Sequence, residues 1–179
     1  MASDTVNNTG SPAGQAAADA VAASMSLYQL AAPLAPGELT AVEAPLAARL
    51  VPPGTLLGAF GIRPTHVGRG ACRAEMTVGP VHLNQRGITQ GGALMALADA
   101  AAGWASYAAA RSGRFTTVSI AGNLLRAAGA GEVLAARAAP VHLGRTTLVI
   151  EVSVTRAADG DSGPPKPLAH VTCTQLILG

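Results

Sequence analysis

The sequence predicts an α+β fold in which an antiparallel sheet of five or six strands wraps around one long central helix. Residues 91–111 are apolar on every side of a helix, and later segments alternate apolar and polar residues. Short turns separate those later segments. A helix that is apolar all round is buried all round, and strands joined by short turns pair antiparallel. We therefore expect the sheet to enclose the helix.

Two strands are expected before the helix, over residues 57–63 and 70–78. The second places Cys72, Ala74 and Met76 on one face and the polar residues Arg73 and Glu75 on the other. Alternation with a period of two is typical of a half-buried strand. An irregular polar stretch, residues 79–90, then leads into the helix.

Four strands are expected after the helix. The clearest covers residues 146–156, where every second residue from Leu148 to Val154 is apolar. The others are expected over residues 116–125, 133–143 and 168–178. The last is preceded by a loop rich in Gly, Pro and Asp.

The chain divides at about residue 54. Residues 1–13 are polar and are expected to form a disordered tail. Residues 15–30 are Ala-rich and helical by composition, and five prolines punctuate the stretch up to residue 54. We therefore expect a tail and an N-terminal helical, Pro-rich appendage over 1–54, followed by one domain over 55–179.

Composition excludes several classes of function. The net charge is only +2, and the basic residues are scattered, which argues against a nucleic-acid surface. Cys72 and Cys173 are not spaced as metal ligands, and neither are the histidines, so we expect no metal and two buried thiols. No basic residue precedes Arg49, so we expect no signal peptide and a cytoplasmic protein. Residues 93–110 contain Asp99, which disfavours a membrane span.

Asp99 is the strongest candidate for chemistry. It is the only charged residue between Arg86 and Arg111, and it lies in the helix that is predicted to be buried. A buried carboxylate is costly unless it is paired or used. One alternative is a structural pairing with an Arg or with backbone amides. The other is a catalytic carboxylate whose pKa is raised by desolvation.

Gly91 and Gly92 begin the same helix. The first amides of a helix have no partner within it and lie at the positive end of the helix dipole. Such amides can stabilise an oxyanion, although a pair of glycines can also simply form a turn. Asn84 can donate its side-chain amide to the same oxygen, or serve as a turn residue.

The string HLNQRGITQGGALMALADAAAGWA, from His82, resembles the signature of the hotdog-fold thioesterases of the PaaI (phenylacetic-acid degradation) type, which include 4-hydroxybenzoyl-CoA thioesterase-like enzymes. The resemblance extends over about residues 55–178. Seven residues match the signature: His82, Asn84, Gly87, Gly91, Gly92, Asp99 and Gly103. The family usually has His where this chain has Gln90, and Gln can donate and accept hydrogen bonds but carries no proton charge.

The resemblance implies hydrolysis of an acyl-CoA, either aryl (phenylacetyl or hydroxybenzoyl) or medium-chain, to a free acid and coenzyme A. It implies catalytic roles for Asp99, Gly91, Asn84 and Gln90, with Asp99 as nucleophile or general base. It implies substrate contacts from the following residues: His82, Gly92, Arg126, Arg145 and Thr146. His82 is also compatible with a structural role, and Trp104 and Tyr107 with core packing.

Coenzyme A enters as part of the substrate, so no separate cofactor is expected. The family's site forms between subunits, so we expect a homodimer at least, and a homotetramer of two dimers. Two other functions stay open: a non-catalytic module that binds acyl thioesters, and a hotdog dehydratase or hydratase. Release of free thiol distinguishes hydrolysis from binding.

Overall fold

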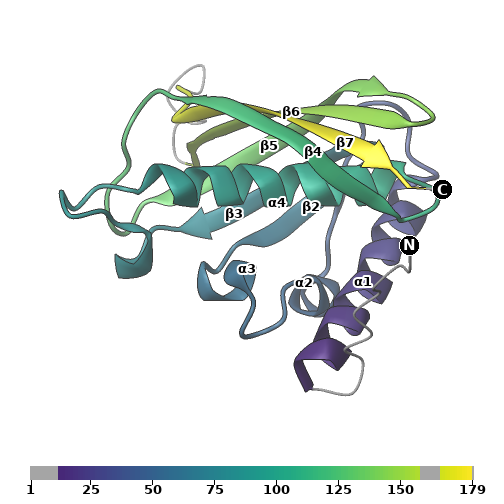
Figure 1. Ribbon diagram of the computed structural model, residues 1–179, viewed down its shortest axis with the longest axis horizontal. Coiled ribbons are helices and arrows are strands. Elements are labelled where there is room, and N and C mark those ends of the chain that lie inside the picture. The colour runs from purple at the N-terminus through teal and green to yellow at the C-terminus, as the bar shows by residue number, and fades with distance from the viewer. Residues whose placement is uncertain (1–11, 158–165, 179) are drawn as a thin grey trace, which may run out of the picture.

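The computed structural model describes residues 12–157 and 166–178 of the chain (Figure 1). The helices among these residues are α1 (Pro12–Ala31), α2 (Ala44–Leu50), α3 (Leu56–Ala59), the short 3-10 helix η1 (Pro80–His82) and α4 (Gly91–Ala109). The strands are β1 (Thr40–Ala41), β2 (Arg63–Gly68), β3 (Ala71–Thr77), β4 (Phe115–Leu124), β5 (Val133–Leu143), β6 (Thr147–Arg156) and β7 (Ala169–Ile177). The predicted α+β class and hotdog arrangement are confirmed.

The described strands form one antiparallel sheet in the order β1-β2-β3-β5-β6-β7-β4. The sheet has seven strands where the sequence predicts five or six, and the difference includes β1, whose two residues pair with β2. Two residues are too few to show an alternating pattern. Strand β4 follows α4 in the chain but lies at the sheet edge, beside β7.

The core lies between α4 and the concave face of the sheet. Alanines such as Ala98, Ala101 and Ala105 are fully buried on α4, so the sheet backbone can approach the helix closely. On β6, every second residue from Leu148 to Val154 is buried, as the alternation predicts. Both cysteines are buried, which confirms the expectation for them.

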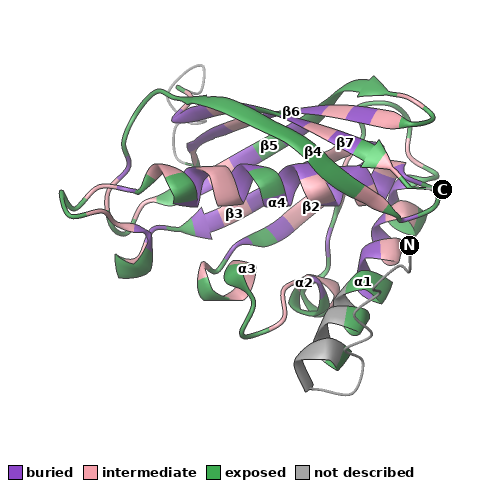
Figure 2. Ribbon diagram, viewed as in Figure 1, coloured by how far each residue is buried: buried purple, intermediate pink, exposed green. Residues whose placement is uncertain are grey.

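The edge strand β4 is the most exposed strand of the sheet. Nearly every residue of β4 is exposed, and Figure 2 shows the strand green along its length. Val118 is 55% exposed and Leu124 52%. The central strands carry polar outer residues such as Arg73, Glu151 and Thr172. Exposed apolar residues therefore lie along the β4 edge and on β5, where Val141 is 64% exposed.

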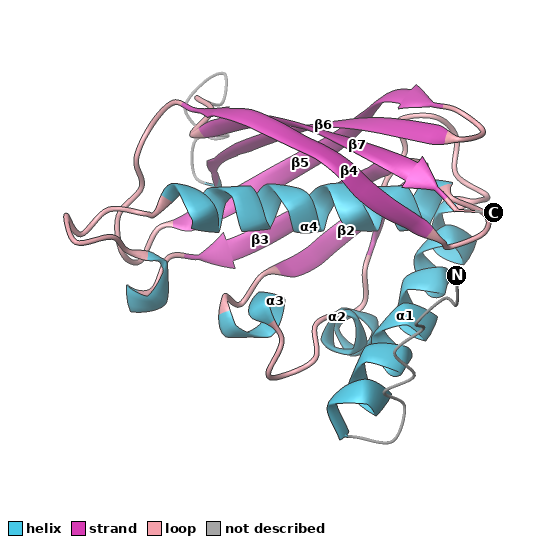
Figure 3. Ribbon diagram, viewed as in Figure 1, coloured by secondary structure: helices cyan, strands magenta, loops and turns pink. Residues whose placement is uncertain are grey.

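The predicted strand over residues 57–63 is wrong, because residues 56–59 form helix α3 (Figure 3). Thr55 caps this helix: its side-chain oxygen accepts a hydrogen bond from the Gly58 amide at 3.1 Å. Gly61 then turns the chain with φ of +60° before β2 begins at Arg63. A threonine N-cap stabilises a helix start by about 1 kcal/mol, which a short apolar run does not reveal.

The N-terminal helices pack beside α4 and β2 (Figure 3). Helix α1 buries Ala23, Leu27 and Ala31, which share one helix face and belong to the same core as α4. Strand β1 also comes from this segment. The boundary at residue 54 stays a prediction, but the appendage is docked on the domain.

Residues 1–11 of the predicted tail and 158–165 of the predicted loop lie outside the described residues. Within the part of the chain that the structure describes, no helix is long and apolar enough to cross a membrane.

Candidate active site

The start of α4 presents two backbone amides. Within the described residues, neither Gly91 nor Gly92 donates its N–H to a backbone acceptor, whereas the Ala93 amide bonds to the Gln90 carbonyl at 2.9 Å. A Cβ placed on Gly92 would meet nothing within 4 Å, whereas a Cβ on Gly91 would clash with Leu124 Cδ1. The space beside Gly92 is therefore open, and an oxyanion site at these amides stays a prediction.

The loop before α4 is fixed by the side chain of Asn84. Its Oδ1 accepts hydrogen bonds from the amides of Arg86 (2.8 Å) and Ile88 (3.5 Å). Gly87 completes the turn with φ of +72°. Because Oδ1 is the acceptor in both bonds, the Nδ2 group is oriented away from the turn, and it is the atom that can donate to a carbonyl.

His82 is buried and has a partner for each ring nitrogen. Its Nδ1 accepts a hydrogen bond from the Gly79 amide at 2.8 Å, which assigns the proton to Nε2, and Nε2 donates to the Phe60 carbonyl at 3.0 Å. The rings of His82 and Phe60 also meet edge to face at 5.0 Å. The His82 carbonyl accepts the Gln90 amide at 2.7 Å. The residue thus holds the loop to the start of α4, with no ring nitrogen left for a ligand.

Gln90 is the N-cap residue of α4, and its side chain makes no capping hydrogen bond. The side chain is exposed in the single chain. Its amide group is therefore available at the mouth of the helix start, where the family has His.

Asp99 differs from the expectation in one respect: its side chain is exposed in the single chain rather than buried. The face of α4 on which it lies carries Gly92, Ala96 and Gly103, and a Cβ on either glycine would meet no neighbour within 4 Å. Small residues leave the carboxylate uncovered. The apolar surroundings still displace water and raise the pKa of Asp99 above its usual value.

Cys173 of β7 is close enough to Asp99 to be influenced by its charge. Burial, and then the negative charge of Asp99, raise the pKa of the Cys173 thiol to about 11. The thiol therefore stays neutral at physiological pH and is a poor nucleophile. A reactive role for Asp99 stays a prediction.

The structure does not bring all the predicted residues together. Asp99 follows Gly91 by eight residues, which is about 12 Å along the helix axis. Arg126 lies beyond the end of β4 near the start of α4, where it donates to the Pro167 carbonyl at 2.7 Å. Arg145 and Thr146 lie in the β5–β6 turn at the opposite end, beside the C-terminus of α4. The helix start, Asp99 and Arg145 thus occupy three separate levels along α4.

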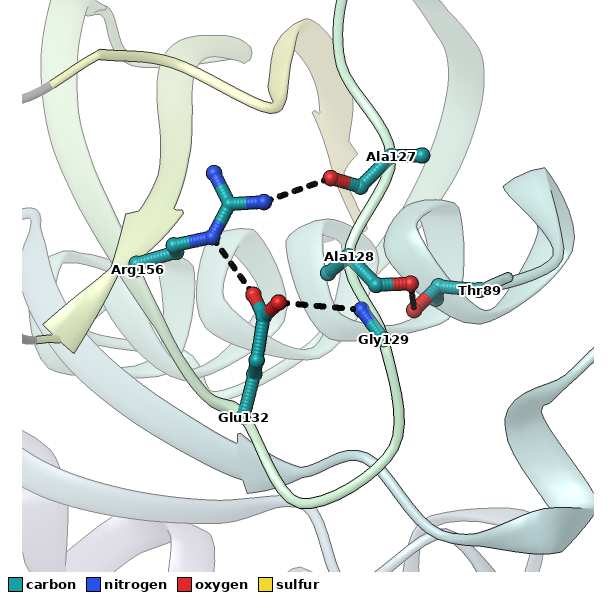
Figure 4. Close-up of polar contacts among 6 residues, drawn as sticks. All are labelled: Thr89, Ala127, Ala128, Gly129, Glu132 and Arg156. Carbon is teal, nitrogen blue, oxygen red and sulfur yellow. Dashed lines mark hydrogen bonds and ion pairs between the residues drawn. The ribbon is translucent and has the colours of Figure 1, made fainter. Parts of the chain in front are cut away.

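A clamp that the sequence did not indicate holds the segment after β4 against the helix start (Figure 4). Thr89 donates its hydroxyl to the Ala128 carbonyl at 2.9 Å, and Arg156 donates to the Ala127 carbonyl at 2.7 Å. Glu132 accepts from both Arg156 and the Gly129 amide. The Glu132–Arg156 pair joins the ends of β5 and β6, which only their pairing register brings together.

The chain matches the family model described as the thioesterase superfamily over residues 86–162. None of the curated protein sequences compared with the chain matches it.

Solved structures are similar to this one. A mutant of the phenylacetic acid degradation protein PaaI from Thermus thermophilus is 31% identical with a TM-score of 0.60, and the match covers 68% of this chain and 97% of that one. The E. coli PaaI protein from the phenylacetic acid degradation operon is 25% identical with a TM-score of 0.60, covering 69% and 83%. A hypothetical thioesterase from Streptococcus pneumoniae, solved with coenzyme A, is 26% identical with a TM-score of 0.55, covering 62% and 80%.

Proposed function

The chain belongs to the thioesterase superfamily, among the PaaI-like acyl-CoA thioesterases of the hotdog fold, and we propose that its site combines Asp99 of one subunit with the first α4 amides of a second. The observation that carries this proposal is the distance between the start of α4 and Asp99 within one chain. About 12 Å of helix lies between Gly91 and Asp99, so one thioester carbonyl cannot contact both in the same subunit.

The edge strand supports a second subunit. Among the described strands, β4 pairs only with β7, so its other edge has unpaired amides and carbonyls. The strand is ten residues long and carries exposed Val118, Ile120 and Leu124. Antiparallel pairing with the β4 of a second copy covers this edge and sets the two α4 helices antiparallel. The start of one helix then lies beside the middle of the other. A tetramer of two such dimers is the proposed assembly.

The chemistry follows from three groups. The carbonyl oxygen of the thioester accepts hydrogen bonds from the Gly91 and Gly92 amides, and from Nδ2 of Asn84, which stabilise the negative charge that forms there. As general base, Asp99 takes a proton from water while the water oxygen attacks the carbonyl carbon. The C–S bond then breaks, and the coenzyme A thiolate leaves and takes a proton. No separate cofactor takes part in this route.

As nucleophile, Asp99 instead attacks the carbonyl carbon itself. The C–S bond breaks, the coenzyme A thiolate leaves and takes a proton, and water then hydrolyses the resulting mixed anhydride to the product acid and free Asp99. The two routes differ in where the oxygen of water arrives. After a single turnover in ¹⁸O-labelled water, attack by water on the aspartyl carbon of the anhydride leaves the label in Asp99, whereas general-base catalysis leaves it only in the product acid. Mass spectrometry of the Asp99 peptide measures this.

The substrate is an acyl-CoA, and we propose an aryl-acyl group (phenylacetyl or hydroxybenzoyl) or a medium-chain acyl group. A coenzyme A ligand is supported by the Streptococcus pneumoniae structure, which contains it. The experiment is release of free thiol from a panel of aryl, short, medium and long acyl-CoAs, followed with a thiol-reactive dye. Binding without thiol release by any member would reduce the chain to an acyl-thioester-binding module.

The two-subunit site has a direct test by complementation. Asp99→Asn and Gly91→Pro each disable one half of the site, and mixing the two inactive proteins under subunit exchange forms hybrid dimers with one intact site. Random exchange restores about a quarter of wild-type activity. A mixture that stays inactive after exchange, verified by mass spectrometry of differently tagged subunits, would refute the two-chain site.

A further inference from the structure

A cavity of about 530 Å³ lies at the C-terminal end of α4, and Asp99 does not line it. Its walls come from α1, the β2–β3 turn, the end of α4, the β5–β6 turn and β7. Three arginines line it, Arg69, Arg111 and Arg145, and no acidic residue does among the described ones. Of these three arginines, the sequence predicts a substrate contact only for Arg145.

The three arginines form no ion pair with an acidic residue of the described chain. In the described residues, the ion pairs with a carboxylate use Arg63, Arg156 and His170, and none uses Arg69, Arg111 or Arg145. The C-terminus of α4 adds only about half a negative charge. Three positive charges around one cavity thus leave a net excess that favours an anion with several charges.

The cavity is held in shape by tight contacts. A Cβ on Gly70, next to Arg69, would lie 2.9 Å from Leu143, so the β2–β3 turn packs directly on the β5–β6 hairpin that carries Arg145. A Cβ on Gly113 would clash with Met25 Sδ, so α1 packs against the turn that follows Arg111. Four segments distant in sequence therefore place the three arginines around the same cavity.

One wall of the cavity is aromatic and another offers acceptors. Tyr28 of α1 is half-buried and lines the cavity, and an aromatic ring is a surface on which a purine base stacks. Ala108 and Ala109 lie in the last turn of α4, where carbonyls have no helical partner. Within the described chain, no later backbone amide bonds to either carbonyl. Such carbonyls can accept hydrogen bonds from an amino group.

We propose that this cavity binds the nucleotide end of coenzyme A, with Arg69 and Arg111 joining Arg145 around the phosphates and Tyr28 stacking on the adenine. The inference rests on the proposed function and assigns a role to the N-terminal helix. Ala109 follows Asp99 by ten residues, about 15 Å along α4. An extended pantetheine arm spans that distance, so the thioester reaches Asp99 of the same chain.

The first test measures binding without turnover. Calorimetry of the full chain uses adenosine 3′,5′-bisphosphate as the probe, with wild type, Arg69→Gln, Arg111→Gln and the double variant. Each single change weakens binding about tenfold, because a charge-assisted hydrogen bond to phosphate is lost. The control is Arg49→Gln, which removes the same charge from an exposed Arg on α2, outside this cavity, and leaves the affinity unchanged.

The second test separates the nucleotide from the acyl group. In both arginine variants, KM for an acyl-CoA rises about tenfold, whereas kcat stays at the wild-type value. With the same acyl group on pantetheine, which lacks the nucleotide, KM does not change. Tyr28→Ala weakens bisphosphate binding several-fold, and Tyr28→Phe, which keeps the ring, does not.

Several results would overturn the inference. One is a double variant that binds the bisphosphate with wild-type affinity. Another is an Arg49→Gln variant that loses as much affinity for the bisphosphate as the Arg69 and Arg111 variants do. A third is a KM for the acyl-pantetheine that rises in the arginine variants as much as the KM for the acyl-CoA. Inorganic phosphate that binds as tightly as the bisphosphate would reduce the cavity to a general anion site. Bisphosphate binding through the arginines in a chain that hydrolyses no acyl-CoA would refute the proposed hydrolysis and leave this inference standing.

Discussion

The two ends of α4 differ in the chemical groups that they present. At the N-terminal end, the amides of Gly91 and Gly92 have no backbone acceptor among the described residues, and the nearby side chains of His82 and Asn84 hold the loop. At the C-terminal end, three arginine side chains from separate segments surround a cavity. In the proposed function, reaction chemistry depends on backbone geometry, whereas recognition depends on long side chains that tertiary packing brings together. Asp99 lies between the two ends.

The largest effect is expected from Asp99→Asn, which tests whether the reaction is centred between the two ends. Asn keeps the volume and removes the charge and basicity, so kcat should fall about 10²-fold or more. KM should change little, because Asn does not block the site. Thermal unfolding of the same protein is the control, and its midpoint should not fall. Wild-type turnover in a stable variant would remove Asp99 from the mechanism.

Gly91→Pro tests the role of the N-terminal end through the backbone alone. Proline suits the first position of a helix, and the extended conformation of Gln90 (ψ of 137°) suits a residue before proline. The change removes one N–H donor and should lower kcat about 10²-fold. Gly91→Ala is the matched control, because its Cβ meets Leu124 in the same way but the amide remains. Equal losses in both variants would attribute the effect to crowding.

The raised pKa of Asp99 sets the sign of the pH dependence. The carboxylate is the reactive form, so kcat should rise about tenfold per pH unit up to a pKa above the usual Asp value and then level off. The same group binds its proton more tightly in the folded state, so its contribution to stability is lost as pH rises through that pKa. Rate measurements from pH 4 to 8 check this, with the residual activity of Asp99→Asn as the control. If kcat still rises with pH in Asp99→Asn, the rise would be due to the titration of another group.

Thr89→Val tests how much the hydrogen bonds that hold the segment after β4 to the start of α4 contribute to stability and to activity. The buried hydroxyl loses its hydrogen bond to the Ala128 carbonyl, while the Thr89 amide keeps its own bond to that oxygen. We expect a loss of about 1 kcal/mol, or roughly 3 °C in Tm, with kcat lowered less than about threefold. Thr89→Ser retains the hydroxyl and should match wild type in Tm. A large loss of kcat without a loss of Tm would place Thr89 in the site itself.

The smallest effect is expected from Gln90→His, which introduces the side chain that the family usually has. Gln90 is exposed and makes no capping bond, so the fold should not change. If the position only orients groups by hydrogen bonding, kcat should change less than about threefold. Gln90→Ala, which deletes the amide, should lose more. An increase of tenfold or more in the His variant would show that a proton-carrying group matters there.

Much of the fold could be read from periodicity. The long helix was predicted within two residues of its observed end, and the strands after it within one residue at most ends. Helix α3 and strand β1 were missed, because a capped turn of four residues and a pair of two residues are too short for a repeating pattern. The residues of the candidate site could also be predicted where they lie close together in the sequence. Asn84, Gly91, Gly92 and Asp99 lie within 16 consecutive residues and form a recognisable string.

The sequence by itself determined the central helix, the antiparallel strands around it and the lone acid on the helix, because local spacing controls which side chains share a face. Tertiary structure alone decided three other features: the exposure of Asp99, the position of β4 at an open edge, and the cavity that unites Arg69, Arg111 and Arg145. The physical reason is distance along the chain. These features depend on which strands pair and which turns pack together, and charges on segments tens of residues apart leave no periodic trace in a sequence.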